Sequence, residues 1–197
     1  MKPLVLLSLV AAAVMLQPRA EAHEEIYSAV LSGANVSPPN GSPGTGFVTF
    51  TWDLDLFTLR IQADFTNLQG TVTAAHIHAA TLMPFTGTAG IATQLPSLPA
   101  FPTGGTSGTY DQTIDFTLAS SYNPDFIAAN GGTVATAANV FYNAFRDGRA
   151  YFDIETSSFS GGEISGFVGV PEPSTTALLS AGVFAAAVGS WRRRCKK

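Results

Sequence analysis

Through most of the chain, short stretches of alternating apolar and polar side chains are separated by turn-forming residues. The clearest stretch is 59–65, in which three polar residues alternate with four apolar ones. Successive side chains of a β-strand point to opposite faces, so this pattern predicts a half-buried strand. Residues 46–53 place Val48, Phe50 and Trp52 on one face in the same way. The break at 54–57 joins the two stretches into a predicted hairpin.

Six further segments have the length and apolar content of strands, and clusters of Gly, Pro, Asn and Ser separate them. They are residues 26–31, 71–78, 91–95, 110–118, 150–155 and 163–168. With the hairpin they make eight short strands. Such a series predicts an all-β fold, an antiparallel Greek-key β-sandwich or barrel of superoxide-dismutase-like or immunoglobulin-like type.

One region, residues 123–147, breaks the strand pattern and predicts a small helical insertion. Asn123 followed by Pro124 is typical of a helix start, and the two glycines at 131–132 end that first turn. Residues 133–147 then carry apolar side chains at helical spacing up to Gly148. The alternative for this region is another strand, because its alanines and valines also suit a sheet.

The N-terminus is typical of a secretory signal peptide. One lysine precedes an apolar run that extends to residue 16, and Ala20-Glu21-Ala22 fits the rule for a cleavage site. Residues 1–22 are therefore predicted to be removed by cleavage between Ala22 and His23. The domain that follows is predicted to span residues 23–169. The alternative to a signal peptide at residues 1–22 is a buried N-terminal helix.

The C-terminus, residues 170–197, carries a second targeting pattern. Residues 174–191 form an uncharged stretch of 18 residues, which is just long enough for a transmembrane helix. Five of the six residues after them are basic and would stay in the cytoplasm. The single cysteine, Cys195, lies in this tail, so the predicted exported domain has no disulfide. The export signal at one end and the retained tail at the other therefore predict the same topology, with the domain exported and the C-terminus in the cytoplasm.

The order of these C-terminal features resembles the PEP-CTERM sorting signal of Gram-negative bacteria. The motif itself is Pro171-Glu172-Pro173, directly before the apolar stretch and the basic tail. The resemblance implies that an exosortase of the inner membrane removes the tail. It also implies transient membrane contact through 174–191, followed by release to the cell surface or extracellular matrix. A plain single-pass anchor is the alternative.

The charge distribution argues against nucleic acid as a partner. The whole chain of 197 residues has a formal net charge of −4, but most of its basic residues lie at the two ends. Residues 23–170 keep three arginines against twelve carboxylates, a net charge of −9. A body of that sign repels DNA, RNA and anionic lipid.

Three segments of the body together resemble the CHRD domain, a module named after the chordin family. They are Leu31-Ser32-Gly33-Ala34-Asn35 with Pro38-Pro39, then Ala75-His76-Ile77-His78, and finally Gly161-Gly162-Glu163-Ile164-Ser165-Gly166. The resemblance implies an extracellular, β-rich binding module without established catalysis. Three places depart from the family pattern: Glu155 replaces a histidine, Ser165 replaces an arginine, and Val36-Ser37 replace the common Glu-Val before the prolines. A more distant likeness, to copper/zinc superoxide dismutase, is analogy only.

His76 and His78 are the sharpest chemical candidates. Residues two apart on a strand share a face, so the pair could hold a metal ion if a third ligand joined it. We take Glu155 as the predicted third ligand, and His23, Asp153 and Glu163 are the other available donors. The favoured interpretation is nevertheless structural, with both histidines hydrogen-bonded and no cofactor. A divalent metal is the alternative.

The acidic residues offer weaker candidates. Asp53 with Asp55, or Asp153 with Glu155, could bridge calcium, although solvated carboxylates are the ordinary case. Glu163, after two glycines, is interpreted as a turn or strand-pairing residue rather than an acid catalyst.

Together these features predict an exported, non-catalytic CHRD-type module that acts at the cell surface or in the extracellular matrix. Its expected partners are the processing exosortase and either an extracellular polysaccharide or another surface protein. The alternative function is a metal-binding protein, for copper, zinc or calcium, or a degenerate superoxide-dismutase-like protein. The sequence predicts no enzyme activity.

Overall fold

The structure is a computed structural model that describes residues 23–169. The predicted signal peptide, including Ala22, lies outside the described residues. So do the Pro171-Glu172-Pro173 motif, the apolar stretch 174–191 and the basic tail. Within the described range, no helix is long and apolar enough to cross a membrane.

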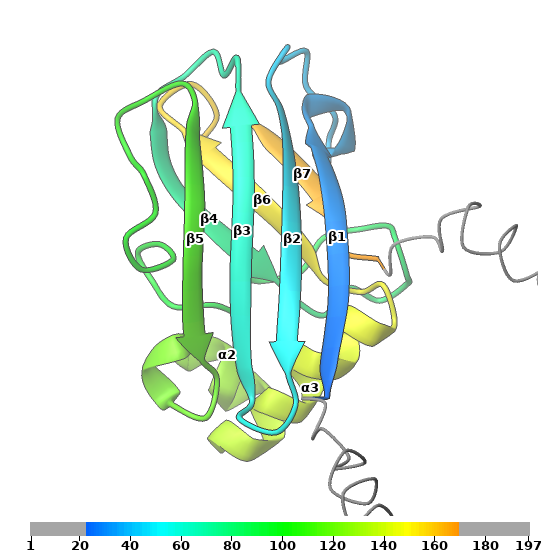
Figure 1. The fold of residues 1–197 in the computed structure, drawn as a ribbon. Coiled ribbons are helices and arrows are strands. Elements are labelled where there is room, and N and C mark those ends of the chain that lie inside the picture. Colours follow the sequence, from blue (N-terminus) through cyan, green and yellow to red (C-terminus); the bar gives the residue numbers. More distant parts are fainter. Residues whose placement is uncertain (1–22, 170–197) are drawn as a thin grey trace, which may run out of the picture.

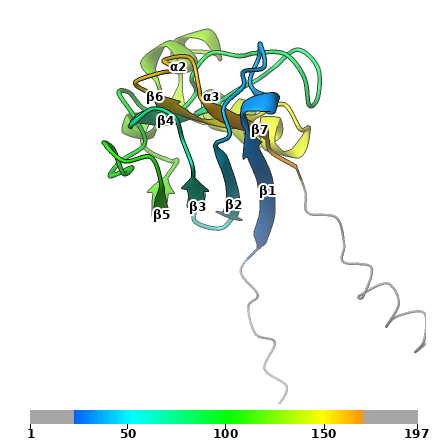
Figure 2. The same ribbon diagram turned by 90° about the horizontal axis from the view of Figure 1, so that it is seen from above.

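Between residues 23 and 169, seven antiparallel strands form one sheet that curls over on itself. The strands are β1 (Glu24–Ser32), β2 (Thr45–Asp53), β3 (Thr58–Thr66), β4 (Val72–His78), β5 (Gly108–Asp115), β6 (Tyr151–Thr156) and β7 (Ile164–Phe167). Their order across the sheet is β4-β6-β7-β1-β2-β3-β5. The curl places β4, β6 and β7 behind β1, β2, β3 and β5, as the two views show (Figures 1 and 2). This half-barrel confirms the predicted all-β sandwich or barrel.

The predicted hairpin is formed by β2 and β3. Phe50 pairs with Ile61 and Thr49 pairs with Gln62, so each face continues across both strands. Phe50 and Ile61 are buried, whereas Thr49 and Gln62 are partly exposed on the outer face. The alternation in the sequence therefore assigned the faces correctly, because a strand with one buried face fixes its own register.

Residues 91–95 were predicted as a strand, and this prediction is wrong. The segment makes only two isolated bridges, at Ile91 and Thr93. Its backbone N–H groups bond to different places: those of Ala92 and Thr93 go to the carbonyl of Ile77, and that of Gln94 goes to the carbonyl of Ser121. In a regular ladder, consecutive N–H groups of a strand point to opposite sides, so two consecutive donors that share one carbonyl break the pattern.

The helical insertion is confirmed as two helices at one end of the sheet, α2 (Pro124–Ala129) and α3 (Val134–Arg146) (Figure 1). Asn123 caps α2 by accepting a hydrogen bond from the backbone N–H of Asp125. Thr133 and Thr136 form a capping box at the start of α3. Two single 3-10 turns, η1 (Gly33–Asn35) and η2 (Ala119–Ser121), complete the elements of the part of the chain that the structure describes.

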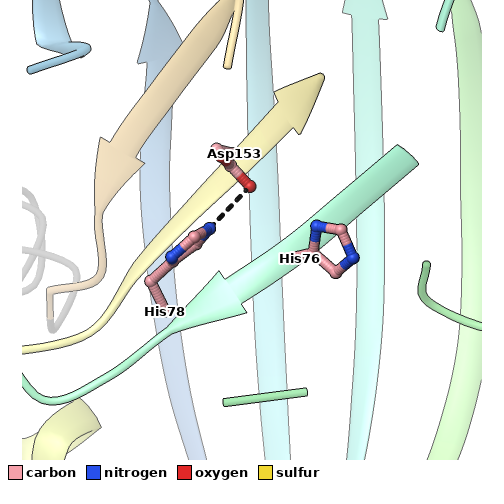
Figure 3. Close-up of side chains that lie close together, drawn as sticks. All are labelled: His76, His78 and Asp153. Carbon is pink, nitrogen blue, oxygen red and sulfur yellow. Dashed lines mark ion pairs between the residues drawn. The ribbon is translucent and has the colours of Figure 1, made fainter. Parts of the chain in front are cut away.

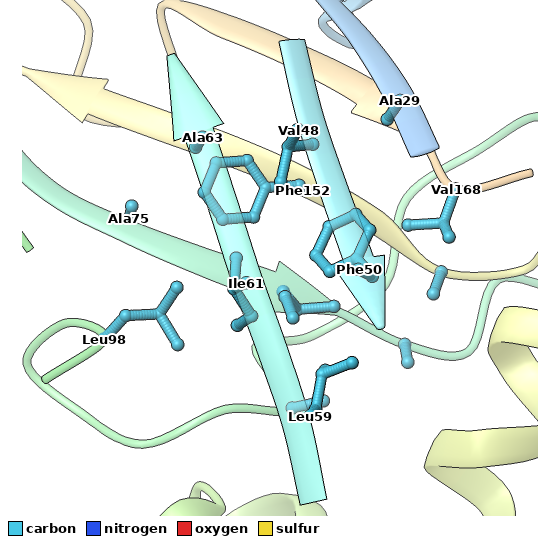
Figure 4. Packing of buried hydrophobic residues seen from close by; sticks show 14 of the residues in the cluster. Ala29, Val48, Phe50, Leu59, Ile61, Ala63, Ala75, Leu98, Phe152 and Val168 are labelled. Atoms are coloured by element: carbon cyan, nitrogen blue, oxygen red, sulfur yellow. The ribbon is translucent and has the colours of Figure 1, made fainter. Parts of the chain in front are cut away.

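The core lies between the two layers of the curled sheet and extends under α3. Phe50 of β2 meets Phe152 of β6 across the layers with ring centroids 6.0 Å apart (Figure 4). At the helical end, Trp52 packs edge-on against Phe141 and Phe145 of α3. These buried aromatic rings supply much of the apolar area that stabilises a domain without a disulfide in its described part.

Candidate functional site: a histidine cluster beside a neutral groove

Pairing of β4 with β6 gathers four titratable side chains on the outer face of the rear layer. His76 and His78 are two apart on β4 and share a face, and His76 lies directly opposite Asp153. Glu155 is two residues beyond Asp153 on the same face of β6. The opposite face of both strands packs into the core. Although this face points outward, His76 and Asp153 are buried, because the segment after β4 folds back over it.

His78 and Asp153 form a close pair without hydrogen-bond alignment. Nε2 of His78 lies 3.3 Å from Oδ1 of Asp153 (Figure 3), yet neither atom has a hydrogen-bond partner among the described residues and both are fully buried. On its other side, Nδ1 of His78 lies 3.0 Å from the carbonyl oxygen of Ala89. The ring of Tyr151 stacks on that of His78 at 4.6 Å. Burial would lower the pKa of His78, but the Asp153 carboxylate outweighs it and raises this pKa.

His76 is held from both sides. Its Nδ1 lies 3.2 Å from Oε1 of Glu155, and its Nε2 lies 2.9 Å from the carbonyl oxygen of Pro96. Burial raises the pKa of Glu155, and the nearby negative charge of Asp153 raises it further, although His76 acts in the opposite direction. The ring centroids of His76 and His78 are 6.3 Å apart and perpendicular.

The structure brings the predicted histidine pair together, but it places Asp153 rather than Glu155 at the shared centre. One ligand atom each from His76, His78 and Asp153 lie within 4.8 Å of one another, and we call these three residues the histidine cluster. Glu155 contacts His76 from outside this group. The other candidate donors lie elsewhere: His23 is exposed and pairs with Asp55.

The first acidic pair has a structural role. Oδ1 of Asp53 accepts hydrogen bonds from the backbone N–H groups of Asp55 and Leu56, both at 2.9 Å. A carboxylate used in this way fixes the turn between β2 and β3. Asp55 instead faces His23.

Glu163 has the most completely paired carboxylate described. It is fully buried and accepts from the hydroxyls of Ser42 and Thr156 and from the backbone N–H groups of Gln69 and Gly70. Burial alone would raise the pKa of Glu163, but these four hydrogen bonds outweigh it and lower the pKa. The arrangement joins two loops to the β6–β7 connection, which agrees with the structural interpretation of this residue.

A small cavity of about 80 Å³ lies against the His78–Asp153 pair. Its walls include Tyr151 and Ser165, and they also include residues from all three segments that resemble the CHRD domain. The first segment contributes Asn35, the second His78 and the third Gly161 and Ser165. Segments that are far apart in the sequence thus meet at this cavity.

A larger groove of about 550 Å³ adjoins the cavity, and the two share Asn35, Ser37, Gly87 and Phe167 among their walls. We call it the neutral groove, because none of its lining residues carries a charge. They are Val30, Ala34, Asn35, Val36, Ser37, Pro39, Phe85, Thr86, Gly87 and Phe167.

Phe85, which sequence reasoning missed, gives the groove an exposed aromatic ring. Its side chain is 61% exposed, and its φ of 57° is in the left-handed region that side chains other than glycine rarely adopt. The backbone N–H of Phe85 bonds to the carbonyl of Gly148 at 2.7 Å, which holds this conformation. A strained backbone that presents an apolar ring to solvent is typical of a binding site. No local sequence pattern marks this residue.

Comparison with protein families confirms both resemblances seen in the sequence. The model of the CHRD domain matches residues 27–168, and that of the PEP-CTERM protein-sorting motif matches residues 169–194. No curated protein and no solved structure matches the chain. The sorting motif implies export, transient membrane anchoring and processing by an exosortase. With most of its length matched, the chain belongs to the CHRD domain family and ends in a PEP-CTERM protein-sorting motif.

Proposed function

We propose that the protein is a non-catalytic binding module of the cell surface or extracellular matrix, and that its neutral groove holds a segment of an uncharged polysaccharide. The observation that carries this proposal is the composition of the groove. The exposed ring of Phe85 and the partly exposed ring of Phe167 lie together with the amide of Asn35 and the hydroxyls of Ser37 and Thr86. Flat apolar rings suit the faces of sugar rings, and amide and hydroxyl groups suit their hydroxyls.

Charge supports an uncharged polymer over an acidic one. Among the described residues, no arginine or lysine lines the groove, so an anionic polysaccharide would find no counter-charge from them. The surrounding domain is acidic and would repel such a polymer at long range. A neutral polymer meets neither obstacle.

The chemistry of the described residues supports binding rather than catalysis. The buried carboxylate of Glu163 already accepts four hydrogen bonds. Within residues 23–169, no histidine is hydrogen-bonded to a serine or threonine hydroxyl, the contact by which a base activates the nucleophile in many acyl-transfer enzymes.

Affinity electrophoresis of the full-length chain in mild detergent tests the proposal. Gels containing a neutral glucan or a neutral galactan should retard the protein, whereas gels containing alginate should not. Phe85→Ala should be retarded less, because its dissociation constant for the polymer should rise about tenfold, equivalent to about 1.4 kcal/mol. Leu82→Ala is the matched control, because Leu82 is in the same loop and 93% exposed but does not line the groove.

Two results would count against this function. Equal retardation of the wild-type and Phe85→Ala proteins would remove the groove from the proposal. Absence of retardation by every neutral polymer, combined with capture of a surface protein that Phe85→Ala abolishes, would assign the groove to a protein partner instead.

A further inference from the structure

We propose that His78 and Asp153, with His76 as the third ligand, bind a divalent transition-metal ion, and that zinc fits these ligands best. The proposal concerns the cavity beside the histidine cluster and is independent of what the neutral groove binds.

The hydrogen bonding of His78 determines which of its nitrogen atoms faces Asp153 as a ligand. A carbonyl oxygen only accepts, so the contact of Nδ1 with the Ala89 carbonyl at 3.0 Å places a proton on Nδ1. In the neutral ring, Nε2 then carries a lone pair. This lone pair meets a second acceptor, Oδ1 of Asp153, at 3.3 Å. Two buried acceptors without a donor are costly, and a cation between them removes the cost.

The distance between these two atoms matches a metal site. Zinc binds imidazole nitrogen at about 2.0–2.1 Å and carboxylate oxygen at about 2.0–2.2 Å, in tetrahedral geometry. Two such ligands at the tetrahedral angle are about 3.3 Å apart, which is the separation of Nε2 of His78 and Oδ1 of Asp153. The carbonyl of Ala89 provides the outer hydrogen bond that commonly orients a metal-binding histidine.

His76 supplies the third ligand from the same strand face. One ligand atom each from His76, His78 and Asp153 lie within 4.8 Å of one another. Closing this set around one ion shortens the widest separation by at most about 1.5 Å, which requires the His76 side chain to move. The ring then gives up one of its present contacts, with Glu155 or with the carbonyl of Pro96. Of the two acids on β6, Asp153 becomes the ligand and Glu155 an outer contact.

The cavity leaves a fourth position for water. Its volume of about 80 Å³ holds two or three water molecules at about 30 Å³ each, and it is bounded by both His78 and Asp153. Two imidazoles and one carboxylate favour zinc or copper over calcium, which takes six to eight oxygen ligands. Three protein ligands and one water molecule would complete the four-coordinate shell of zinc, which fits both the residues and the space.

Titration of the full-length chain with zinc chloride and, in parallel, with cobalt(II) chloride tests the proposal. Calorimetry near neutral pH should give one zinc per chain, and cobalt should give the strong visible absorption of a tetrahedral ion. Zinc at a hundredfold excess over its dissociation constant should stabilise the native state by about 2.7 kcal/mol, seen as a rise in melting temperature. His78→Gln and Asp153→Asn should each lose this response.

Two further variants locate the ion. His23→Gln should bind as the wild type does, because His23 is exposed and lies outside the cluster. Glu155→Gln should weaken binding by about tenfold to a hundredfold at most, as an outer contact does. If Asp153→Asn fails to fold, His76→Gln replaces it, with folding checked by circular dichroism.

The competing state is a proton shared by His78 and Asp153, and the same titration distinguishes it. A wild-type protein that gives no calorimetric signal and no cobalt spectrum would assign the pair to a proton and overturn the proposal. Binding that His23→Gln abolishes would also overturn it, by moving the ion to the N-terminal region. These outcomes leave polysaccharide retardation unchanged, so failure here is separate from failure of the proposed function.

Discussion

Oε2 of Glu163 lies 2.7 Å from Oγ1 of Thr156, and this fully buried hydrogen bond joins the residue before β7 to the end of β6. The same carboxylate holds the loop before β2 through Ser42 and the loop before β4 through Gln69 and Gly70. One buried side chain therefore connects three segments that are distant in the sequence. Its charge is retained because four donors replace the water it has lost.

Replacement of Glu163 by glutamine should destabilise the protein by about 2–4 kcal/mol. The amide has almost the same shape as the carboxylate. Its NH₂ group, however, must face at least one of the groups that now donate a hydrogen bond to the carboxylate. Urea denaturation followed by circular dichroism measures the change. Glu24→Gln is the control, since Glu24 is exposed on β1 and should shift the midpoint little. Equal midpoints for the two variants would contradict the structural role of Glu163.

The stabilising effect of Glu163 should depend on pH in a defined direction. Its folded-state pKa is lowered below the ordinary 4.5, so the unfolded chain binds the proton more readily. The contribution is therefore complete above about pH 4.5 and is lost as pH falls through the folded-state pKa. Free energies of unfolding measured from neutral pH downward should show the wild type and Glu163→Gln converging below about pH 4.5. A constant difference across that range would mean that the lowered pKa is wrong.

The two faces of β3 should respond differently to the same substitution. Ile61→Thr places a hydroxyl in the core and removes apolar volume, so it should cost about 2–4 kcal/mol. Gln62→Thr on the outer face removes only a weak hydrogen bond to Asp111 and should cost under about 1 kcal/mol. Thermal melts of both variants measure the contrast. Similar losses of stability in the two variants would mean that Ile61 and Gln62 are assigned to the wrong faces of β3.

The regular elements could be predicted because their periodicity reports local geometry. Phe50 and Ile61 alternate with polar neighbours, and this period survives in the structure as one buried face. Phe141 and Phe145 of α3 repeat at helical spacing and are both buried. The segment 91–95 has no comparable signal, because tertiary partners on β4 and η2 determine where its backbone bonds go.

The histidine cluster could be predicted only in part. His76 and His78 share a strand face by period alone, and the structure keeps them there. Asp153 and Glu155 also share a face, so the period does not choose between them. The register between β4 and β6 makes the choice, because it sets Asp153 directly opposite His76. That register depends on the whole sheet, and no local pattern records it.

Processing should produce two new chain ends. The signal pattern and the PEP-CTERM motif predict a mature protein that starts at His23 and loses everything after about Pro173. Cleavage before His23 would turn its backbone nitrogen into a new ammonium group. This nitrogen lies 3.5 Å from Oδ2 of Asp55. Intact-mass analysis of protein extracted from the cell surface measures both ends. A species that retains residues 192–197 would indicate a plain membrane anchor.

The exposure of Phe85 should depend on the absence of a side chain at Gly148. Gly148 has a φ of 64°, and a Cβ there would overlap the Phe85 ring. Gly148→Ala should therefore displace the ring and weaken polysaccharide retardation, although Gly148 itself does not line the groove. Gly132→Ala is the matched control: its φ is 74°, so it carries similar backbone strain of about 1–2 kcal/mol, but a Cβ there meets no atom within 4 Å. Both variants should melt at lower temperature, and only Gly148→Ala should lose retardation. If both variants were retarded like the wild type, the position of the Phe85 ring would not control binding in the groove.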